Sequence, residues 1–260
     1  MKHVLKKGEI SNLEGGDSEE TFLVTYLGKK FVLRKYETVK EANYYASIHK
    51  KLEKYDILPK LHYKEKNKLL FEYIEGRDCK KRDALKFAYQ VGRICGAINS
   101  LKIKTRLFKF KPLNYAILLF RKNKSFTEEH LVMIEKQYSD LKNDSNQPVA
   151  IEFDDVYPEN FRLRNGKIYL VDIEDMNYNF KGAGIAKSFI KWFRTPKQRS
   201  NFKEGYESIA SMRFMTKEYL QFLYFNFLIF NMAYKIKKRK ELNKRDFSLL
   251  MTILSGKEIY

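Results

Sequence analysis

Short runs of β-branched and aromatic residues dominate the first part of the chain. Residues 21–26 and 30–36 form two such runs, and the segment Leu27-Gly28-Lys29 between them is typical of a hairpin turn. Apolar residues then recur at close to the helical period over residues 39–52. This pattern predicts a β-hairpin that is followed by a helix.

Two further strand-like runs, at residues 60–63 and 68–74, end just before Gly76. Beyond Gly76 the spacing of apolar residues becomes helical, so we expect a link between two lobes at this point. The predicted fold class is α+β and bilobal. Residues 1–76 are expected to form an antiparallel β-sheet lobe, and residues 77–260 a mainly helical lobe with a small sheet insert.

Helical patterns recur along the second lobe. Residues 84–101 place their apolar side chains on one face. The segment Thr127-Glu128-Glu129 predicts a helix start, because the hydroxyl can cap a free amide and the acids suit the helix dipole. Residues 107–119 are apolar without a clear period, and helices are expected to dominate from residue 184 onward.

The most apolar stretch, residues 219–234, is shorter than the about 20 residues that a bilayer-spanning helix requires. It also carries Gln221, Asn226 and Asn231, so a buried helix is the better interpretation. The first residues lack an apolar core long enough for a signal peptide. We therefore expect a cytoplasmic protein with no transmembrane segment.

Charge adds a second line of inference. The 260 residues include 51 Lys and Arg against 32 Asp and Glu, a formal net charge of +19. Such a charge attracts nucleic acid, an anionic membrane surface or phosphorylated ligands. The basic residues are spread along the chain apart from one dense run at residues 235–240, so a solvated basic surface and a dedicated polyanion site both stay open.

Cys79 and Cys95 share no ligand-type spacing with each other or with the four histidines. Structural zinc sites and disulfide scaffolds depend on such spacing or on denser cysteine use. Neither is expected in this protein.

The candidate chemistry begins after residue 149, where two apolar segments each deliver a carboxylate into a loop. The first leads to Asp155 and, five positions later, Asn160; the second ends at Asp172, and the turn Asn165-Gly166 lies between them. Kinase-like enzymes use this spacing for phosphoryl transfer: one Asp orients and deprotonates the attacking hydroxyl, and the Asn and second Asp hold Mg²⁺ on the ATP phosphates. Purely structural roles are the alternatives to these catalytic ones: Asp155 could form a turn, and Asp172 could cap a loop.

Features of the first lobe fit a nucleotide. Gly15, Gly16 and Ser18 precede the first hairpin, where backbone amides can close over phosphates. Arg34 is expected to place its charge on the phosphates, and Glu41 on the following helix to pair with it.

The segment at residues 69–76 has the pattern of an inner strand that runs into a hinge. Backbone groups near Glu72 to Ile74 would then bind the adenine edge. Taken singly, each of these features is also compatible with ordinary turn, strand and core residues.

Together these segments resemble the choline/ethanolamine kinases and aminoglycoside phosphotransferases, a superfamily with a protein-kinase-like fold. The resemblance runs from about residue 13 to about residue 192 and is most specific after Asp172. There the chain is similar to the choline-kinase branch in its acidic Glu174, an Asn177-Tyr178 pair, a Gly and the ending Phe189-x-x-Trp192.

The resemblance implies roles for individual residues. Asp155 matches the catalytic base, and Asn160 and Asp172 match the Mg²⁺ ligands. The candidates for binding ATP are Gly15, Gly16, Ser18, Arg34, Glu41, Glu72 and Ile74. The candidates for contacting the acceptor are Asp154, Glu174, Tyr178, Lys191 and Trp192. The implied activity is ATP- and Mg²⁺-dependent phosphorylation of a small-molecule hydroxyl, with nucleotide in the first lobe and the catalytic loop and substrate site in the second.

The chain departs from the family pattern at Phe153, where members usually have His, and at Asp154, where a second carboxylate would raise the pKa of its neighbours. The third departure is Lys191. Choline kinases carry an acidic residue before the Trp, and a cation there would repel choline.

Several functions therefore stay open. Among kinases of small molecules, an amino alcohol acceptor comes first by resemblance and a sugar or aminoglycoside second. The departures favour a nucleotide-binding pseudokinase scaffold, and residues 235–240 favour a nucleic-acid or membrane-surface binder. The oligomeric state is left open.

Overall fold

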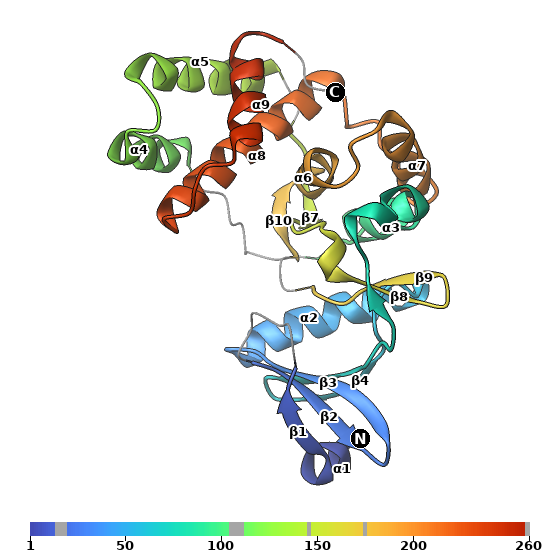
Figure 1. Ribbon diagram of the computed structural model, residues 1–260. Helices are drawn as coiled ribbons and strands as arrows, with labels where there is room; N and C mark the ends of the chain where they lie inside the picture. Colours follow the sequence, from blue (N-terminus) through green and yellow to red (C-terminus); the bar gives the residue numbers. More distant parts are fainter. Residues whose placement is uncertain (14–19, 104–111, 145–146, 174–175, 258–260) are drawn as a thin grey trace.

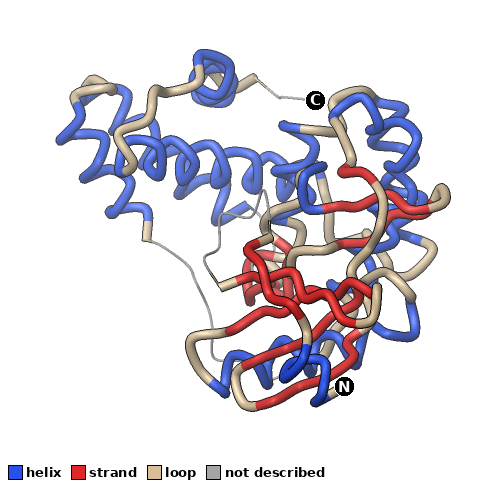
Figure 2. Tube along the Cα trace, turned by 60° about the horizontal axis from the view of Figure 1, so that its bottom comes forward, coloured by secondary structure: helices blue, strands red, loops and turns tan. Residues whose placement is uncertain are grey.

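The computed structural model describes residues 1–13, 20–103, 112–144, 147–173 and 176–257. The predicted phosphate-loop residues Gly15, Gly16 and Ser18 and the acidic Glu174 lie outside the described residues. The molecule has a sheet region at its N-terminal end and a helical region at its C-terminal end (Figure 1). Figure 2 shows the same division, with most strands gathered in one half and the long helices in the other. The α+β, bilobal fold class is confirmed.

The sheet region is built from five antiparallel strands in the order β1-β2-β3-β5-β4. Helix α2 packs against β4 and β5 of this sheet. The elements are α1 (Lys2–Lys7), β1 (Glu9–Asn12), β2 (Thr21–Tyr26), β3 (Lys29–Lys35), α2 (Val39–Leu52), β4 (Leu61–Glu65) and β5 (Lys68–Glu72). The predicted hairpin, helix and strand pair are confirmed, while α1 and β1 were not predicted.

Two hairpin turns follow directly from local chemistry. Leu27 and Gly28 join β2 to β3 with φ of 49° and 73°, and Asn165 and Gly166 have φ of 52° and 78°. Two consecutive left-handed residues make a turn whose twist matches that of the flanking strands. Gly and Asn tolerate this conformation best, so Gly28, Asn165 and Gly166 mark the two turns, while Leu27 adopts a conformation that is uncommon for its residue type.

The helical region also holds two small antiparallel sheets, ordered β10-β7 and β6-β8-β9. Its strands are β6 (Arg77–Asp78), β7 (Val149–Phe153), β8 (Phe161–Arg164), β9 (Lys167–Leu170) and β10 (Met176–Phe180). Its helices are α3 (Ala84–Asn99), α4 (Leu113–Asn123), α5 (Glu128–Asp144), α6 (Ala183–Lys191), α7 (Pro196–Glu207), α8 (Lys217–Lys237) and α9 (Lys244–Leu254). The ambiguous apolar stretch at residues 107–119 thus contains the start of α4.

Helices α3 and α7 approach each other through glycines. A Cβ built on Gly92 would lie 2.0 Å from the Phe202 carbonyl oxygen, and one on Gly205 would lie 1.9 Å from the Tyr89 carbonyl oxygen. Only a residue without a side chain fits such an approach. The contact fixes α3 beside α7, and α3 also packs against β7, the strand that leads to Asp155.

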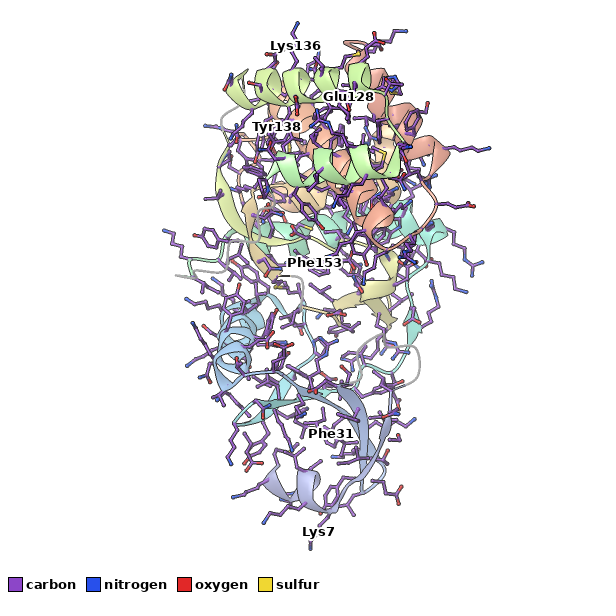
Figure 3. All side chains as sticks on the ribbon, turned by 90° about the vertical axis from the view of Figure 1, so that its left-hand side faces the viewer. Lys7, Phe31, Glu128, Lys136, Tyr138 and Phe153 are labelled. Carbon is purple, nitrogen blue, oxygen red and sulfur yellow. The ribbon has the colours of Figure 1, made fainter. Side chains whose placement is uncertain are left out.

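The core of the helical region is aromatic. Phe222, Phe225 and Leu228 of α8 are fully buried, as expected for a buried helix at residues 219–234. No helix within the described residues is both long and apolar enough to cross a bilayer. Figure 3 shows Tyr138 among these helices, Phe153 near the middle of the molecule and Phe31 in the sheet region, where a separate small core forms.

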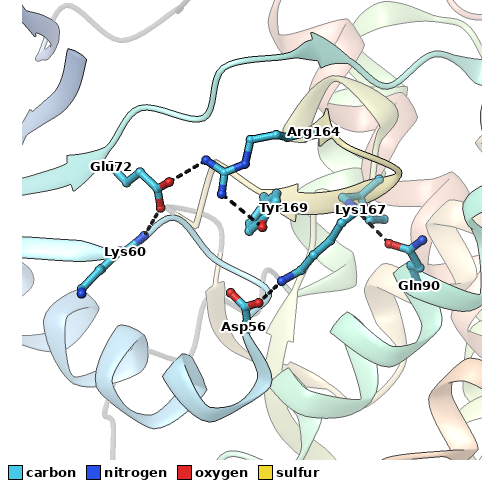
Figure 4. A network of polar contacts seen from close by, with 8 residues as sticks. Asp56, Lys60, Glu72, Gln90, Arg164, Lys167 and Tyr169 are labelled. Carbon is cyan, nitrogen blue, oxygen red and sulfur yellow. Dashed lines mark hydrogen bonds and ion pairs between the residues drawn. The ribbon is translucent and has the colours of Figure 1, made fainter. Parts of the chain in front are cut away.

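A polar network joins the sheet region to the β8–β9 hairpin (Figure 4). Arg164 donates to Glu72 at 2.6 Å and to the Tyr169 hydroxyl at 3.2 Å, and Lys167 pairs with Asp56. The backbone amide of Lys60 also donates to Glu72. The hydrogen bonds of Glu72 therefore hold the end of β5 in place. Residues 73–76, which include the predicted link at Gly76, then connect β5 to β6.

Candidate active site

A cleft of about 970 Å³ lies between the sheet and the loop that follows β7. Among its lining residues are Arg34, Glu72, Ile74, Asp155, Asn160 and Asp172. Six residues that were predicted from separate parts of the sequence thus share one cavity. Apolar side chains line it from both sides, namely Leu13, Leu23, Val32, Phe71, Ile74, Val171 and Ile173.

Asp155 is held at both carboxylate oxygens. Its Oδ2 accepts a hydrogen bond from Nδ2 of Asn160 at 2.8 Å, and its Oδ1 lies 2.6 Å from Nζ of Lys187. Asn160 Nδ2 also donates to the Asp155 carbonyl oxygen at 2.8 Å. The loop between the two residues is closed by these bonds, so the carboxylate has a defined orientation toward the cleft.

Asp154 is turned to different partners. Both of its oxygens accept from Nδ2 of Asn179 on β10, at 3.0 and 2.9 Å. Strand β10 pairs with β7, which brings Asn179 opposite Ala150, at the start of the strand that leads into the loop. The second carboxylate therefore has its own hydrogen-bond donor, and it does not line the cleft.

Glu152 is the third acid of this segment, and it is buried. It accepts from Nδ2 of Asn99 at 2.5 Å and from the backbone amides of Gly182 and Gly184 at 2.7 and 3.3 Å. Burial raises the pKa of Glu152 to about 8, against the effect of these donors. The acid ties β7 to the first turn of α6.

Phe153 stands where the family has His, and it is buried rather than polar. Its ring contacts Phe161 edge-to-face, with centroids 6.3 Å apart. A Cβ on Gly184 would lie 2.0 Å from the Phe153 carbonyl oxygen, so α6 packs directly on the loop backbone. Apolar packing and a close backbone contact thus support the loop here.

Arg34 does not form the expected pair with Glu41. Its Nη1 instead lies 3.1 Å from Oδ1 of Asp172 across the cleft, and the Arg34 side chain is only 12% exposed. Glu41 lies in the first turn of α2, where its amide is capped by the Thr38 hydroxyl, and within the described residues it makes no ion pair with Arg34. Arg34 reaches Asp172 instead, and His49, two turns further along α2 than Glu41, is the described α2 residue that lines the cleft with Arg34.

His49 is a neutral partner for Arg34. Burial, and then the charge of Arg34, lower the pKa of His49 to about 3. Its ring packs on Phe71, with centroids 4.6 Å apart. His49 therefore adds no charge beside the Arg34–Asp172 ion pair.

Besides Asp154, three predicted acceptor residues lie outside the cleft lining. Trp192 is buried and stacks on Phe193 at 4.5 Å, and Tyr178 packs partly buried on β10. Lys191 is turned inward, where its Nζ lies 2.5 Å from both oxygens of Asp246 on α9.

Two ion-pair partners of predicted site residues were not predicted from the sequence: Asp246, which pairs with Lys191, and Lys187, which pairs with Asp155. Asp246 is 1% exposed and also accepts from Nδ2 of Asn231 at 2.9 Å, while Nζ of Lys235 lies 3.9 Å away. Burial first, and then the charges of Asp155 and Asp246, raise the pKa of Tyr157 to about 12. A charged residue in an apolar segment, such as Lys187 in residues 183–190, was the available signal.

The cleft residues could supply only some of the oxygen ligands that a magnesium ion coordinates. Within the described residues no group of three His, Cys, Asp or Glu side chains gathers as a metal site. Asn160 donates through Nδ2, which leaves its amide oxygen, with the Asp172 carboxylate, as oxygen ligands in the cleft. One or two protein ligands together with phosphate oxygens are the usual surroundings of Mg²⁺ at a nucleotide.

No protein-family model and no curated protein sequence matches the chain. Solved structures do resemble it over nearly its full length. The choline kinase LicA from Streptococcus pneumoniae has a TM-score of 0.66 and 15% identity, over 97% of this chain and 95% of that one. A choline kinase from Cryptosporidium parvum Iowa II has a TM-score of 0.62 and 15% identity, over 96% and 89%.

A spectinomycin phosphotransferase, APH(9)-Ia, in complex with ADP and spectinomycin has a TM-score of 0.62 and 14% identity, over 94% of this chain and 88% of that one. These likenesses show the fold. The chain has the kinase-like architecture that choline kinases and aminoglycoside phosphotransferases share.

Proposed function

We propose that this chain, which has the fold of the choline/ethanolamine kinases and aminoglycoside phosphotransferases, is an ATP- and Mg²⁺-dependent phosphotransferase that acts on a hydroxyl group of a small molecule. One observation carries the proposal. Asp155, hydrogen-bonded to Asn160, shares a single cleft with Asp172 and Arg34. Phosphoryl transfer needs an oriented base and charge that faces the phosphates, and little else from the protein.

The cleft suits a nucleotide. Its apolar walls, with Val32 on one side and Ile173 on the other, fit a flat base, and the backbone of residues 72–74 supplies edge contacts. In this proposal Arg34 leaves Asp172 for the phosphates. Asn160 and Asp172 hold Mg²⁺, which when bound offsets the negative charge of the phosphate oxygens.

In the proposed reaction Asp155 accepts a hydrogen bond from the acceptor hydroxyl and aims its oxygen at the γ-phosphorus. A bond forms between that oxygen and phosphorus, the bond from phosphorus to the bridging oxygen breaks, and ADP leaves. The hydroxyl proton passes to Asp155. A loose transition state requires mostly orientation and charge stabilisation, so a carboxylate that is held at both oxygens suits the task.

The charges beside Tyr157 bear on the acceptor. A quaternary ammonium group needs an uncompensated carboxylate or an open aromatic face. Here Asp246 is already paired with Lys191, and the ammonium groups of Lys187 and Lys191 lie over the rings of Tyr157 and Phe227 at 4.6 and 5.6 Å. We therefore propose an uncharged hydroxyl compound, such as a sugar or polyol, in preference to choline, ethanolamine or a polycationic aminoglycoside.

A panel of acceptors tests this preference. We expect choline and ethanolamine to leave ADP release at the acceptor-free rate, and at least one sugar or polyol to raise it. The measurement is ADP release with Mg²⁺ and ATP, with identification of the phosphorylated product by mass spectrometry. A saturable stimulation by choline would contradict the preference.

The nucleotide role of Arg34 gives a second prediction. Arg34→Met should weaken MgATP binding by roughly ten- to a hundredfold, since a charge-assisted hydrogen bond contributes about 1.5–3 kcal/mol. Isothermal titration calorimetry measures the change. Glu41→Gln is the matched control, and it should leave the affinity unchanged because Glu41 lies outside the cleft lining. Equal losses in the two variants would restore Glu41 to the nucleotide site.

The function as a whole is tested by two measurements on the wild-type chain. MgATP should raise the melting temperature, and Mg²⁺-dependent ADP release should follow. Stabilisation by MgATP without ADP release would favour a nucleotide-binding scaffold. Absence of both, with salt-sensitive binding to heparin, would favour a polyanion binder that uses the basic residues 235–240.

A further inference from the structure

Helix α6 directs a lysine at the candidate catalytic base. Nζ of Lys187 lies 2.6 Å from Oδ1 of Asp155, and the two side chains are 21% and 32% exposed. The same ammonium group lies 4.6 Å from the centroid of the Tyr157 ring. Lys187 therefore contacts the Asp155 carboxylate and the face of the Tyr157 ring, both in the loop that follows β7.

The surroundings make this pair different from an exposed ion pair. Exposed pairs contribute little because water screens both charges. Here both partners are partly buried, and the opposite oxygen of Asp155 is held by Asn160 at 2.8 Å. A carboxylate has about four lone-pair sites, so two oxygens that each accept one bond still have room for an acceptor hydroxyl.

Rigid elements fix where Lys187 lies. Glu152, three residues before Asp155, binds the amides of Gly182 and Gly184 at the start of α6. The loop and the helix that supplies the lysine are thus anchored to each other by one buried acid. This arrangement sets the distance between Lys187 and Asp155 independently of any ligand.

We propose that Lys187 is a positioning residue for Asp155 and that its positive charge stabilises the transfer step. The inference rests on the proposed phosphotransferase function. Lys187 holds the carboxylate in the orientation that receives the hydroxyl. It also supplies positive charge beside the point where a negatively charged phosphoryl group meets the acceptor oxygen, which is where fixed charge lowers a barrier most effectively.

Basal hydrolysis of MgATP, with water as the acceptor, tests the proposal without knowledge of the natural acceptor. Lys187→Met should lower kcat by roughly ten- to a hundredfold, as loss of one fixed charge or donor does. The KM for ATP should stay within twofold, since Lys187 does not line the nucleotide cleft. Lys187→Arg should recover part of the loss, because it restores the charge but not the exact geometry.

Lys181→Met is the matched control. The Lys181 ammonium also lies over an aromatic ring, that of Phe214 at 4.3 Å, but it is not paired with the catalytic loop. We expect its kcat to equal that of the wild type, and melting temperatures of all variants separate loss of fold from loss of rate.

The outcomes are distinct. An unchanged kcat in Lys187→Met, or a loss that Lys187→Arg does not relieve at all, would overturn the role of Lys187 while the phosphotransferase function stands. A wild-type chain that binds MgATP and releases no ADP would overturn both. A selective fall in kcat with partial recovery by Arg supports the proposal.

Discussion

Replacing Asp155 by Asn is expected to lower the rate of ADP release by roughly 10³-fold, the scale at which a positioned general base contributes. Asn keeps the size of the side chain but cannot accept the hydroxyl proton. Its amide group would also face a donor, either Lys187 or Asn160, where the carboxylate now accepts. MgATP should still raise the melting temperature, because the cleft retains Arg34 and its apolar walls. Steady-state ADP release and thermal unfolding measure the two effects.

Asp154→Asn is the control for this experiment. The two acids are adjacent in sequence, but Asp154 is bound to Asn179 and lies outside the cleft lining. We expect Asp154→Asn to retain most of the activity. Equal losses in both variants would mean that net charge of the loop matters more than one base, and full activity of Asp155→Asn would remove Asp155 from the mechanism.

Local chemistry explains what could be predicted from the sequence. Gly28, Asn165 and Gly166 suit their turns because Gly and Asn tolerate the left-handed conformation, and the capping hydroxyl of Thr127 accepts from the His130 amide at 3.2 Å. Arg34, Asn160 and Asp172 share a cleft because their strands and loops converge there. The spacing from Asp155 to Asn160 and Asp172, and the position of Arg34 on its strand, were enough to predict that these residues belong to one site.

Long-range pairing explains which features could not be predicted from the sequence. The alternation of apolar and polar residues in Met176–Phe180 is typical of a strand, but five residues do not reveal its partner, which is β7, more than twenty residues earlier. Arg34 meets Asp172 from a distance of 138 positions in the chain, and that partner replaces the nearby Glu41. Lys187 meets Asp155 in the same way. Such contacts depend on how elements pack, which periodicity does not encode.

Replacing Glu152 is expected to have the largest effect on stability. Glu152→Ala should lower the free energy of unfolding by about 3–5 kcal/mol, because three buried donors would lose their acceptor at about 1–3 kcal/mol each, less what water recovers. The donors are Nδ2 of Asn99 and the amides of Gly182 and Gly184. Urea unfolding measures the change. Glu159→Gln is the control, since Glu159 is exposed and should leave stability unchanged.

The same residue gives stability a defined pH dependence. Burial raises the pKa of Glu152 from 4.5 to about 8, so between these values the folded chain holds a proton that the unfolded chain has released. The contribution of Glu152 is therefore fully present below about pH 4.5 and is lost as the pH rises through about 8. Glu152→Gln should remove this part of the slope, because Gln does not titrate. A wild-type chain whose unfolding free energy, compared with that of Glu152→Gln, does not fall from about pH 5 to about pH 8 would show that the three donors outweigh burial and keep Glu152 ionised. In that case α6 would be anchored to β7, ahead of the candidate catalytic loop, by a carboxylate anion.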